Sequence, residues 1–257
     1  MDLQLTGRTA FVAASTGGLG RAVATMLAGE GANVVVTGRR RKLAESIAGA
    51  LPSAIGVEAD LTTPSGRETA MRRTREAFGE IDILVLNGPG PQPKAAAALD
   101  AEELAGSYDT ILAPAHALIS ETLPGMRKRR WGRILALGSS GVVAPLPNLA
   151  LSNTGRAALA GYLKTLAGEV ALDEVTVNML LPGRIATDRV AELDIATAKR
   201  RGISVEQAVL DSRKTIPARR YGDPSEFAAA AAFLCSGPAS YITGVALRCD
   251  GGLIRSL

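Results

Sequence analysis

Short apolar runs alternate along this chain with longer amphipathic segments. Seven runs rich in β-branched and other apolar residues are predicted as strands, at residues 9–14, 33–37, 54–58, 81–86, 133–137, 176–181 and 245–249. Between them, apolar residues such as Leu43, Ile47 and Leu51 recur at the spacing of one helix face. Further helices are predicted from about residue 21, around residues 104–119, over 150–171 and after Asp223, and Pro114 should bend or interrupt the second of these.

This alternation predicts βαβ units and therefore a parallel sheet. Because βαβ crossovers are right-handed, the helices should cover both faces of one doubly wound α/β sheet of about seven strands. We find no linker or internal repeat, so residues 1–257 are predicted to form a single domain. The polar segment at about residues 186–220 is either a substrate lid beyond the carboxyl ends of the strands or a pair of surface helices.

Composition narrows the classes of function. Hydrophobic residues make up 47% of the 257 residues and charged residues 21%, as in a soluble globular protein. One histidine and two cysteines exclude a disulfide framework and leave little material for a metal site, so no metal is predicted. The uncharged stretches 134–155 and 227–247 are cut by proline, glycine and hydroxyl residues, which argues against membrane spans. The N-terminus lacks a signal-peptide pattern, and we expect a cytoplasmic protein.

The charge balance does not indicate a nucleic-acid partner. The net charge is +4, and three basic runs stand at residues 39–42, 127–130 and 199–201. These runs are separate from one another, and only nine aromatic residues are available for stacking on bases. We therefore expect no nucleic-acid partner.

A glycine-rich turn follows the first predicted strand. Such a turn lets the backbone approach a pyrophosphate, which the N-terminus of the next helix then holds. An NAD-binding protein would carry an acid about twenty residues later, where Arg39 and Arg40 stand here, and forked arginine donors match a phosphate. The pattern favours NADP(H) over NAD, although the arginines also fit a solvated charge run at a helix start. The turn residues predicted to bind the cofactor are Ser15, Gly18, Leu19 and Gly20.

With these motifs in view, nearly the whole chain resembles the short-chain dehydrogenase/reductase family, which has a Rossmann-like fold. Residues 13–20 are similar to its glycine motif, with alanine at the first two places, and residues 241–244 and 250–252 are similar to its C-terminal signature. The resemblance implies further cofactor contacts from an adenine-binding pair, from the second half of an Asn-Asn-Ala-Gly motif and from a Pro-Gly loop that closes on the nicotinamide. In this chain those residues are Asp60, Leu61, Asn87, Gly88, Pro182, Gly183, Ile185 and Thr187.

The family's catalytic residues are matched at one position only. Ser139 falls on the catalytic serine, whereas Ser152 stands in place of the tyrosine, Arg156 in place of the lysine and Ile111 in place of the helical asparagine. A serine hydroxyl is a far weaker acid than a phenol, and a guanidinium does not give up its proton near neutrality. The resemblance is thus to a divergent branch related to 3-oxoacyl-carrier-protein reductases. We take Ser139, Ser152 and Arg156 as the catalytic candidates, with Arg156 also binding the cofactor.

Three functions remain open from the sequence. The first is NADP(H)-dependent reduction of a carbonyl substrate, 3-oxoacyl-like or another ketone, with rerouted acid catalysis. The second is a non-redox lyase, isomerase or cyclase that uses Ser139, Ser152 and Arg156 as an oxyanion site. The third is a catalytically silent nucleotide-binding protein. A homodimer or homotetramer is expected, because the segments 101–126 and 150–171 are apolar over more than one face.

Overall fold

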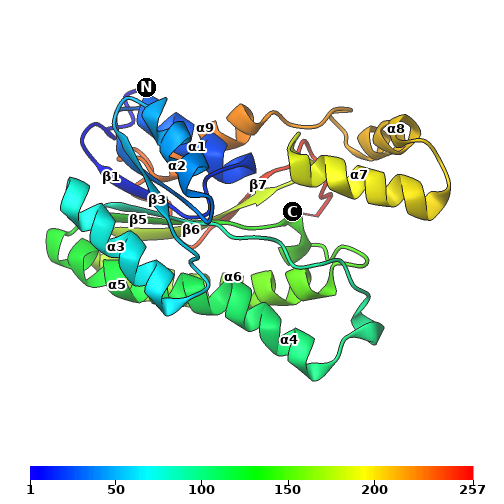
Figure 1. Ribbon diagram of the computed structural model, residues 1–257, viewed down its shortest axis with the longest axis horizontal. Helices are drawn as coiled ribbons and strands as arrows, with labels where there is room; N and C mark the ends of the chain where they lie inside the picture. Colours follow the sequence, from blue (N-terminus) through cyan, green and yellow to red (C-terminus); the bar gives the residue numbers. More distant parts are fainter. Residues whose placement is uncertain (257) are drawn as a thin grey trace.

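Seven parallel strands form one sheet in the order β3-β2-β1-β4-β5-β6-β7 in a computed structural model that describes residues 1–256 (Figure 1). This arrangement confirms the predicted α/β fold. Every pair of neighbouring strands is parallel. The strands are β1 (Thr9–Val12), β2 (Asn33–Gly38), β3 (Ala54–Glu58), β4 (Ile83–Leu86), β5 (Gly132–Leu137), β6 (Val175–Pro182) and β7 (Ala246–Cys249).

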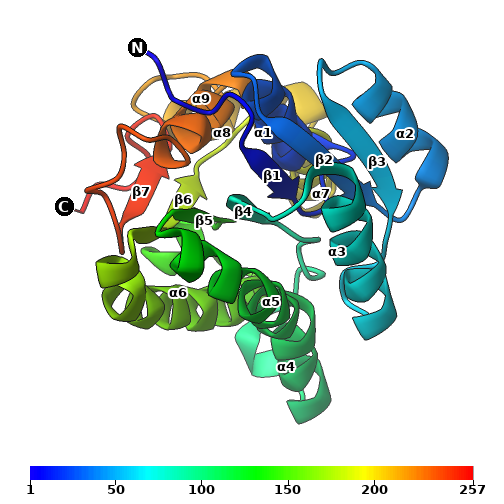
Figure 2. The same ribbon diagram turned by 90° about the vertical axis from the view of Figure 1, so that its left-hand side faces the viewer.

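Helices cover both faces of the sheet, as Figure 2 shows in end view. One face packs against α1 (Gly18–Gly29), α2 (Arg41–Gly49) and α9 (Pro224–Leu234). The other face packs against α3 (Pro64–Phe78), α5 (Ala113–Arg129) and α6 (Ala150–Val170). Each face therefore has its own apolar core, and all residues of β1, β4 and β5 are buried between the two. Burial on both sides explains why these strands read as continuous apolar runs.

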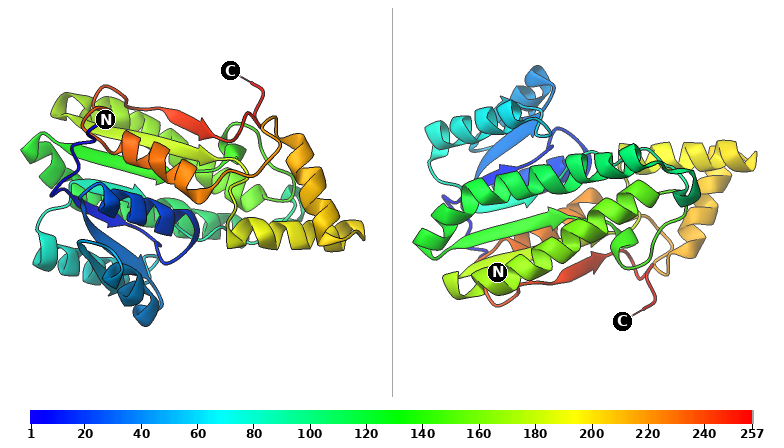
Figure 3. Two further views of the ribbon diagram at one scale, coloured as in Figure 1. Left: turned by 90° about the horizontal axis from the view of Figure 1, so that it is seen from above. Right: turned by 90° about the horizontal axis from the view of Figure 1, so that it is seen from below.

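Two further helices project from one end of the sheet. They are α7 (Asp188–Arg201) and α8 (Val205–Thr215), which pack against each other beyond the carboxyl ends of the strands (Figure 3). The segment predicted at residues 186–220 is thus a helix pair in this position. Ser204 caps α8 by accepting a hydrogen bond from the Gln207 backbone N–H.

Several boundaries differ from the prediction for physical reasons. Helix α1 begins at Gly18, three residues earlier than expected, because the glycine turn leads directly into it. The predicted interruption near Pro114 is present, and it is expected there because proline has no N–H with which to continue the helical hydrogen bonds. The interruption lies just before Pro114, in a π-helical turn at Tyr108–Leu112 that joins α4 (Ala101–Ser107) to α5. Helix α3 was not predicted, because it buries only Ala70, Met71 and Thr74.

The start of α9 was predicted correctly from local sequence. The Asp223 side chain accepts from the Ser225 N–H at 2.7 Å, and the Glu226 carboxylate accepts from the Asp223 N–H at 2.7 Å. Arg220 pairs with Glu226, and this hydrogen-bonded pair holds the pKa of Glu226 at about 2.

Within residues 1–256, no helix has both the length and the apolar character needed to cross a bilayer. The same residues contain no group of three or more histidine, cysteine, aspartate or glutamate side chains placed to hold a metal ion.

The strand order places a candidate site between β1 and β4. From β1 the chain winds outward to β2 and β3, and then crosses back to β4 and onward to β7. At such a reversal, the loops after the two neighbouring strands diverge to opposite faces and leave a crevice at their carboxyl ends. The glycine turn after β1, Asn87 after β4 and Ser139 after β5 all lie at this edge.

Candidate active site

The glycine turn between β1 and α1 leaves the first amides of α1 without a side-chain cap. Gly17 precedes the helix and makes no capping hydrogen bond, while Gly18 adopts a left-handed φ of 52°. A Cβ added to Gly20 would lie 2.7 Å from both the Ala14 carbonyl oxygen and the Asn87 Nδ2 atom, so packing requires glycine there. The uncapped helix N-terminus is suited to an anion such as a pyrophosphate.

Ser15 shapes this turn from inside the protein. Its hydroxyl is fully buried, donates to the Val12 carbonyl at 2.7 Å and accepts from the Thr37 N–H at 3.0 Å. Its own N–H donates to the Thr37 carbonyl. Ser15 was predicted as a cofactor-binding residue, and the structure leaves neither its hydroxyl nor its N–H facing the crevice. Leu19 is partly buried against the core formed by α1, α2 and α9.

Ala14 stands in the turn with a left-handed φ of 46°, which an L-residue adopts at a cost of about 1–2 kcal/mol. We expect Ala14→Gly to raise the free energy of unfolding by about 0.5–1 kcal/mol, since glycine's extra freedom in the unfolded chain offsets part of the gain. Thermal or urea unfolding measures this. The control is Ala13→Gly, which lies at a buried position without a positive φ and should destabilise. A lower free energy of unfolding in Ala14→Gly would contradict the inference that the backbone at Ala14 is strained.

A groove of about 470 Å³ lies beside the turn, between α1 and the beginnings of α7 and α9. It brings Gly18 and Thr187 together, two residues that the sequence analysis assigned to one cofactor. Thr187 precedes α7 without capping it, so its hydroxyl is not consumed by the helix; it makes only a long contact of 3.4 Å to the Ile185 carbonyl.

The Pro-Gly loop after β6 is fixed by close backbone packing. The Gly183 N–H donates to the Cys249 carbonyl at 3.0 Å, and a Cβ at this position would lie 2.6 Å from the Asp250 Cα atom. Pro182 is the last residue of β6, and Ile185 is buried. The loop therefore presents backbone, rather than side chains, at its start.

Arg39 and Arg40 lie exposed just after β2. Neither makes an ion pair with any residue in 1–256, whereas the next residue, Arg41, pairs with Glu45 at 2.8 Å. Asp60, after β3, accepts hydrogen bonds from the Thr62 hydroxyl at 2.7 Å and from the Thr62 N–H at 3.0 Å, and these bonds lower its pKa. Two unpaired guanidiniums at this point can accept an anion without giving up another partner.

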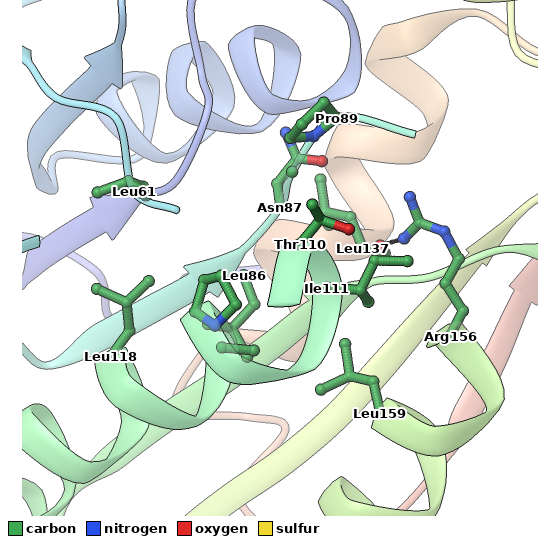
Figure 4. Close-up of a pocket in the computed structure, with 13 residues that line it drawn as sticks. Leu61, Leu86, Asn87, Pro89, Thr110, Ile111, Leu118, Leu137, Arg156 and Leu159 are labelled. Atoms are coloured by element: carbon green, nitrogen blue, oxygen red, sulfur yellow. Dashed lines mark hydrogen bonds between the residues drawn. The ribbon is translucent and has the colours of Figure 1, made fainter. Parts of the chain in front are cut away.

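A cavity of about 40 Å³ lies below the crevice, between the end of β4, the π-helical turn and α6 (Figure 4). This is room for a few atoms or one to two water molecules. Its walls are mostly apolar, and Arg156, Asn87 and Thr110 are the polar side chains among them. The lining residues are Leu61, Leu86, Asn87, Gly88, Pro89, Thr110, Ile111, Pro114, Ala115, Leu118, Leu137, Arg156 and Leu159.

Arg156 reaches from α6 towards the end of β5. Its Nη1 donates to the Leu137 carbonyl at 2.9 Å, and its Nε donates to the Ser152 hydroxyl at 3.3 Å (Figure 4 shows the side chain beside Leu137). Burial, and secondarily the positive charge of Arg189, lower the pKa of Arg156. No carboxylate among residues 1–256 lies within 4.0 Å of it. The protein therefore holds a poorly solvated, unpaired positive charge against the cavity.

Ser152 contacts Arg156 directly, whereas Ser139 lies at the end of β5, two residues after Leu137, which Arg156 also contacts. Ser139 follows β5 and caps a short 3₁₀ helix (Ser140–Val142), because its oxygen accepts from the Gly141 N–H at 3.1 Å. This leaves the Ser139 hydroxyl hydrogen free to donate. Ser152 lies one helical turn before Arg156 and accepts from it, so its hydroxyl hydrogen is also free.

Asn153 is a site residue that the sequence analysis did not identify. Its Nδ2 donates to the Leu146 carbonyl at 2.9 Å, and its Oδ1 accepts from the Leu146 N–H at 3.3 Å. These two bonds tie the loop after Ser139 to the first turn of α6. The only signal in the sequence is its place beside Ser152.

The π-helical turn closes the cavity with an apolar residue. Ile111 is 9% exposed and packs against Gly155 of α6, where a Cβ would lie 2.7 Å from the Ile111 Cδ1 atom. Neighbouring Thr110 turns its hydroxyl back to the Gly106 carbonyl at 2.8 Å. The turn thus offers the cavity no free polar side chain.

None of the four tyrosines lines the cavity. Tyr162 packs on His116 with ring centroids 5.7 Å apart, and burial raises its pKa. Burial also raises the pKa of Tyr221, which donates to the Asp194 carboxylate. Tyr108 and Tyr241 are exposed. No phenol is therefore placed to exchange a proton at the cavity.

Known proteins share this fold over nearly the full chain. Residues 13–254 match a family model described as enoyl-(acyl carrier protein) reductase. Over 98% of its length the chain is 35% identical to the 3-oxoacyl-(acyl-carrier-protein) reductase FabG of Haemophilus influenzae, covering all of that protein. It is 34% identical to FabG of Escherichia coli, covering 98% of this chain and 99% of that protein.

Two solved structures show the same arrangement of elements. The L-sorbose reductase of Gluconobacter frateurii, complexed with NADPH and L-sorbose, superposes with a TM-score of 0.93 at 30% identity, and each chain is covered completely. The 3-ketoacyl-(acyl-carrier-protein) reductase of Brucella melitensis, complexed with NADH, gives a TM-score of 0.85 at 30% identity, with 97% of this chain and 99% of that chain covered.

Proposed function

The chain belongs to the short-chain dehydrogenase/reductase family, and we propose that it reduces a small carbonyl compound with NADPH at a site that lacks the family's tyrosine and lysine. The observation that carries this proposal is the position of Arg156, which projects into the cavity with Ser152 beside it and Ser139 at the neighbouring strand end. The FabG relatives and the L-sorbose reductase are reductases by name, which supports the reaction class.

The crevice fits a dinucleotide at three points. The uncapped N-terminus of α1 and the left-handed Gly18 provide backbone amides for a pyrophosphate. The unpaired Arg39 and Arg40 match a 2′-phosphate, which supports NADPH over NADH. The hydroxyl of Thr187 and the cavity wall at Asn87 and Gly88 would hold the nicotinamide end of the cofactor. When bound, the cofactor would supply the hydride.

The protein's own groups would stabilise the oxygen that gains charge. Arg156 has five N–H donors and uses two of them inside the protein, which leaves three for a ligand. With the Ser139 hydroxyl, it can donate to a carbonyl oxygen and stabilise the developing alkoxide, where a lost donor typically costs 100- to 1000-fold in rate. Arginine does not deliver the proton, so water must do so.

The test is turnover of a panel of ketones and oxo esters by the purified protein, followed at the NADPH absorbance and by product analysis. We expect NADPH consumption matched by formation of the alcohol. Product formation that needs no NADPH would instead establish a non-redox enzyme. Nucleotide binding by calorimetry with no turnover of any substrate would establish a silent nucleotide-binding protein.

We also propose that α7 and α8 form the substrate lid. Their base is fixed by Asp194 of α7, a buried carboxylate that accepts from Arg184 Nη1 at 2.9 Å and from the Tyr221 hydroxyl at 2.9 Å. These bonds join α7 to the Pro-Gly loop and to the chain entering α9.

Asp194→Asn should loosen the lid, because it removes the charge that holds both donors. We expect KM for the carbonyl substrate to rise about 10-fold, and stability to fall by about 1–3 kcal/mol, the cost of leaving buried partners unsatisfied. Steady-state kinetics and thermal unfolding measure the two effects. Glu206→Gln on the exposed surface of α8 is the control, because it makes the same acid-to-amide change away from Asp194 and from the cavity. An unchanged KM in Asp194→Asn would refute the lid assignment.

A homodimer or homotetramer is proposed as well. Leu104 and Tyr108 stay exposed at the α4 end of the helical layer, and covering them would bury apolar surface. Light scattering at micromolar concentration tests this, and a monomer would contradict it.

A further inference from the structure

Arg156 is a positive charge without a counter-ion in the part of the chain described by the structure. Its two hydrogen bonds go to neutral oxygens, those of Leu137 and Ser152. Burying an ion without a partner is costly, and a nearby like charge adds to the cost. Proteins retain such an arrangement where an anionic ligand completes it.

Arg189 is the like charge, and it belongs to the first turn of the lid helix α7. Its Nη2 donates to the Pro91 carbonyl at 3.3 Å, which holds the side chain over the loop that follows β4. A Cβ added to Gly90 would lie 3.6 Å from the same nitrogen. The preceding loop residues, Gly88 and Pro89, line the cavity together with Arg156. The guanidinium of Arg156, from α6, and that of Arg189, from α7, therefore both lie beside the loop at residues 88–91. We call this side of the cavity its mouth.

Two other charged groups of the neighbouring elements, Lys94 and Asp194, are already paired. Lys94, farther along the loop, binds Glu103 through both carboxylate oxygens at 2.5 Å. Asp194 is occupied by Arg184 and Tyr221. Within residues 1–256, Arg189 has one acidic partner, Glu192, at 3.5 Å in an exposed pair, and such pairs contribute little and exchange easily. The guanidinium of Arg156 and the weakly paired guanidinium of Arg189 therefore remain beside the loop at residues 88–91.

The phosphates of the cofactor do not require this charge. Its pyrophosphate would lie at the N-terminus of α1 and its 2′-phosphate at Arg39 and Arg40, which are separate from the loop at residues 88–91. The anionic group that would bind at the mouth therefore belongs to the substrate.

We propose that the substrate is an oxo acid, a carbonyl compound that carries a free carboxylate, with Arg189 binding the carboxylate and Arg156 the carbonyl oxygen. The assignment rests on the proposed reductase function and specifies its substrate class. A forked guanidinium binds a planar carboxylate with paired hydrogen bonds, and its position on the lid helix would couple substrate binding to lid placement. An ester or amide of the same acid lacks the charge and loses this contact.

The experiment compares pyruvate, acetoacetate and levulinate with their methyl esters at saturating NADPH, so that three spacings between carbonyl and carboxylate are covered. We expect kcat/KM for at least one acid to exceed that of its ester by 10-fold or more. Arg189→Gln should raise KM for that acid 10- to 100-fold and leave the ester unchanged. Arg200→Gln, an exposed and unpaired arginine at the other end of α7, should affect neither. Melting temperatures verify that the variants are folded.

A binding measurement separates this inference from the reductase function. Calorimetry of the NADP⁺ complex with lactate, 3-hydroxybutyrate and 4-hydroxypentanoate, the reduced forms of the three oxo acids, should detect binding of at least one acid. This binding should be weakened 10-fold or more by Arg189→Gln and absent for the methyl ester of lactate or 3-hydroxybutyrate. The oxo-acid assignment would be refuted if the esters were turned over as well as their acids and Arg189→Gln changed neither KM. The reductase function would remain supported in that case. Arg189-dependent binding of an acid without any NADPH-linked turnover would support the anion site and refute the reductase.

Discussion

Arg156→Ala is expected to lower kcat/KM for a reducible carbonyl by at least about 100-fold. The change removes three free donors from the cavity, and it removes the charged side chain among the lining residues, which can stabilise an alkoxide. Ser152→Ala should cost less, about 10-fold, because the hydroxyl it removes is neutral and Arg156 remains tied to the Leu137 carbonyl. Steady-state kinetics at saturating NADPH measure both.

The stability of the Arg156→Ala variant provides the internal control. Losing the bond to the Leu137 carbonyl destabilises the protein, while losing an unpaired and partly buried charge stabilises it. Since the two effects oppose each other, the melting temperature should change by only a few degrees. Full activity in a folded Arg156→Ala protein would place the chemistry elsewhere.

The pH profile follows from the same geometry. The pKa values of Tyr162 and Tyr221 are raised by burial, and neither phenol lines the cavity. The logarithm of kcat/KM should therefore show no phenol titration between about pH 6 and 9, where a lysine-assisted tyrosine would titrate. Ser152→Tyr combined with Arg156→Lys would install such a pair and restore ordinary reductase activity if the ring fits. Its profile would then gain that titration.

Arg39→Asp is expected to reverse the cofactor preference. The wild-type protein should bind NADPH more tightly than NADH, because Arg39 has no ion pair within residues 1–256 that a 2′-phosphate would have to replace. The substitution removes a charge-assisted contact with the phosphate. It also places a second carboxylate near Asp60, whose pKa is lowered in part by the charge of Arg39. We expect NADPH affinity to fall about 100-fold and NADH affinity to rise, since an acid at this point can accept from the ribose hydroxyls.

Substitutions at two neighbouring positions, Lys42 and Arg40, serve as comparisons for the effect of Arg39→Asp. Lys42→Asp makes the same charge change on the exposed surface of α2 and should shift the ratio of the two dissociation constants by less than about 3-fold through long-range screening alone. Arg40→Asp tests the second candidate for the phosphate contact. Isothermal titration with both nucleotides measures all three variants. Equal ratios in the wild type and in Arg39→Asp would refute the assignment of the phosphate site.

The local sequence determined most of the fold. Seven apolar runs at strand length fixed the parallel sheet, because a strand buried on both faces needs apolar residues at consecutive positions. The capping box at Asp223 and Glu226 set the start of α9, since both of its hydrogen bonds join residues within one turn. The position of the glycine turn after β1 was predicted correctly. Helix α3 was not predicted, because its buried face is too small to give a clear helical periodicity of apolar residues.

The candidate site needed the tertiary structure. The sequence named Ser139, Ser152 and Arg156, but the bond from Arg156 to Leu137 spans 19 residues and the contact of Arg189 with Pro91 spans 98. It also named Ser15 among the cofactor residues, and only the pairing of β1 with β2 shows that this hydroxyl is turned inward to Val12 and Thr37. Residue type and local periodicity decide which segments become strands and helices. The direction of a polar side chain depends on which distant donors and acceptors surround it, and those are set only when the sheet has brought the ends of β1, β4, β5 and β6 together.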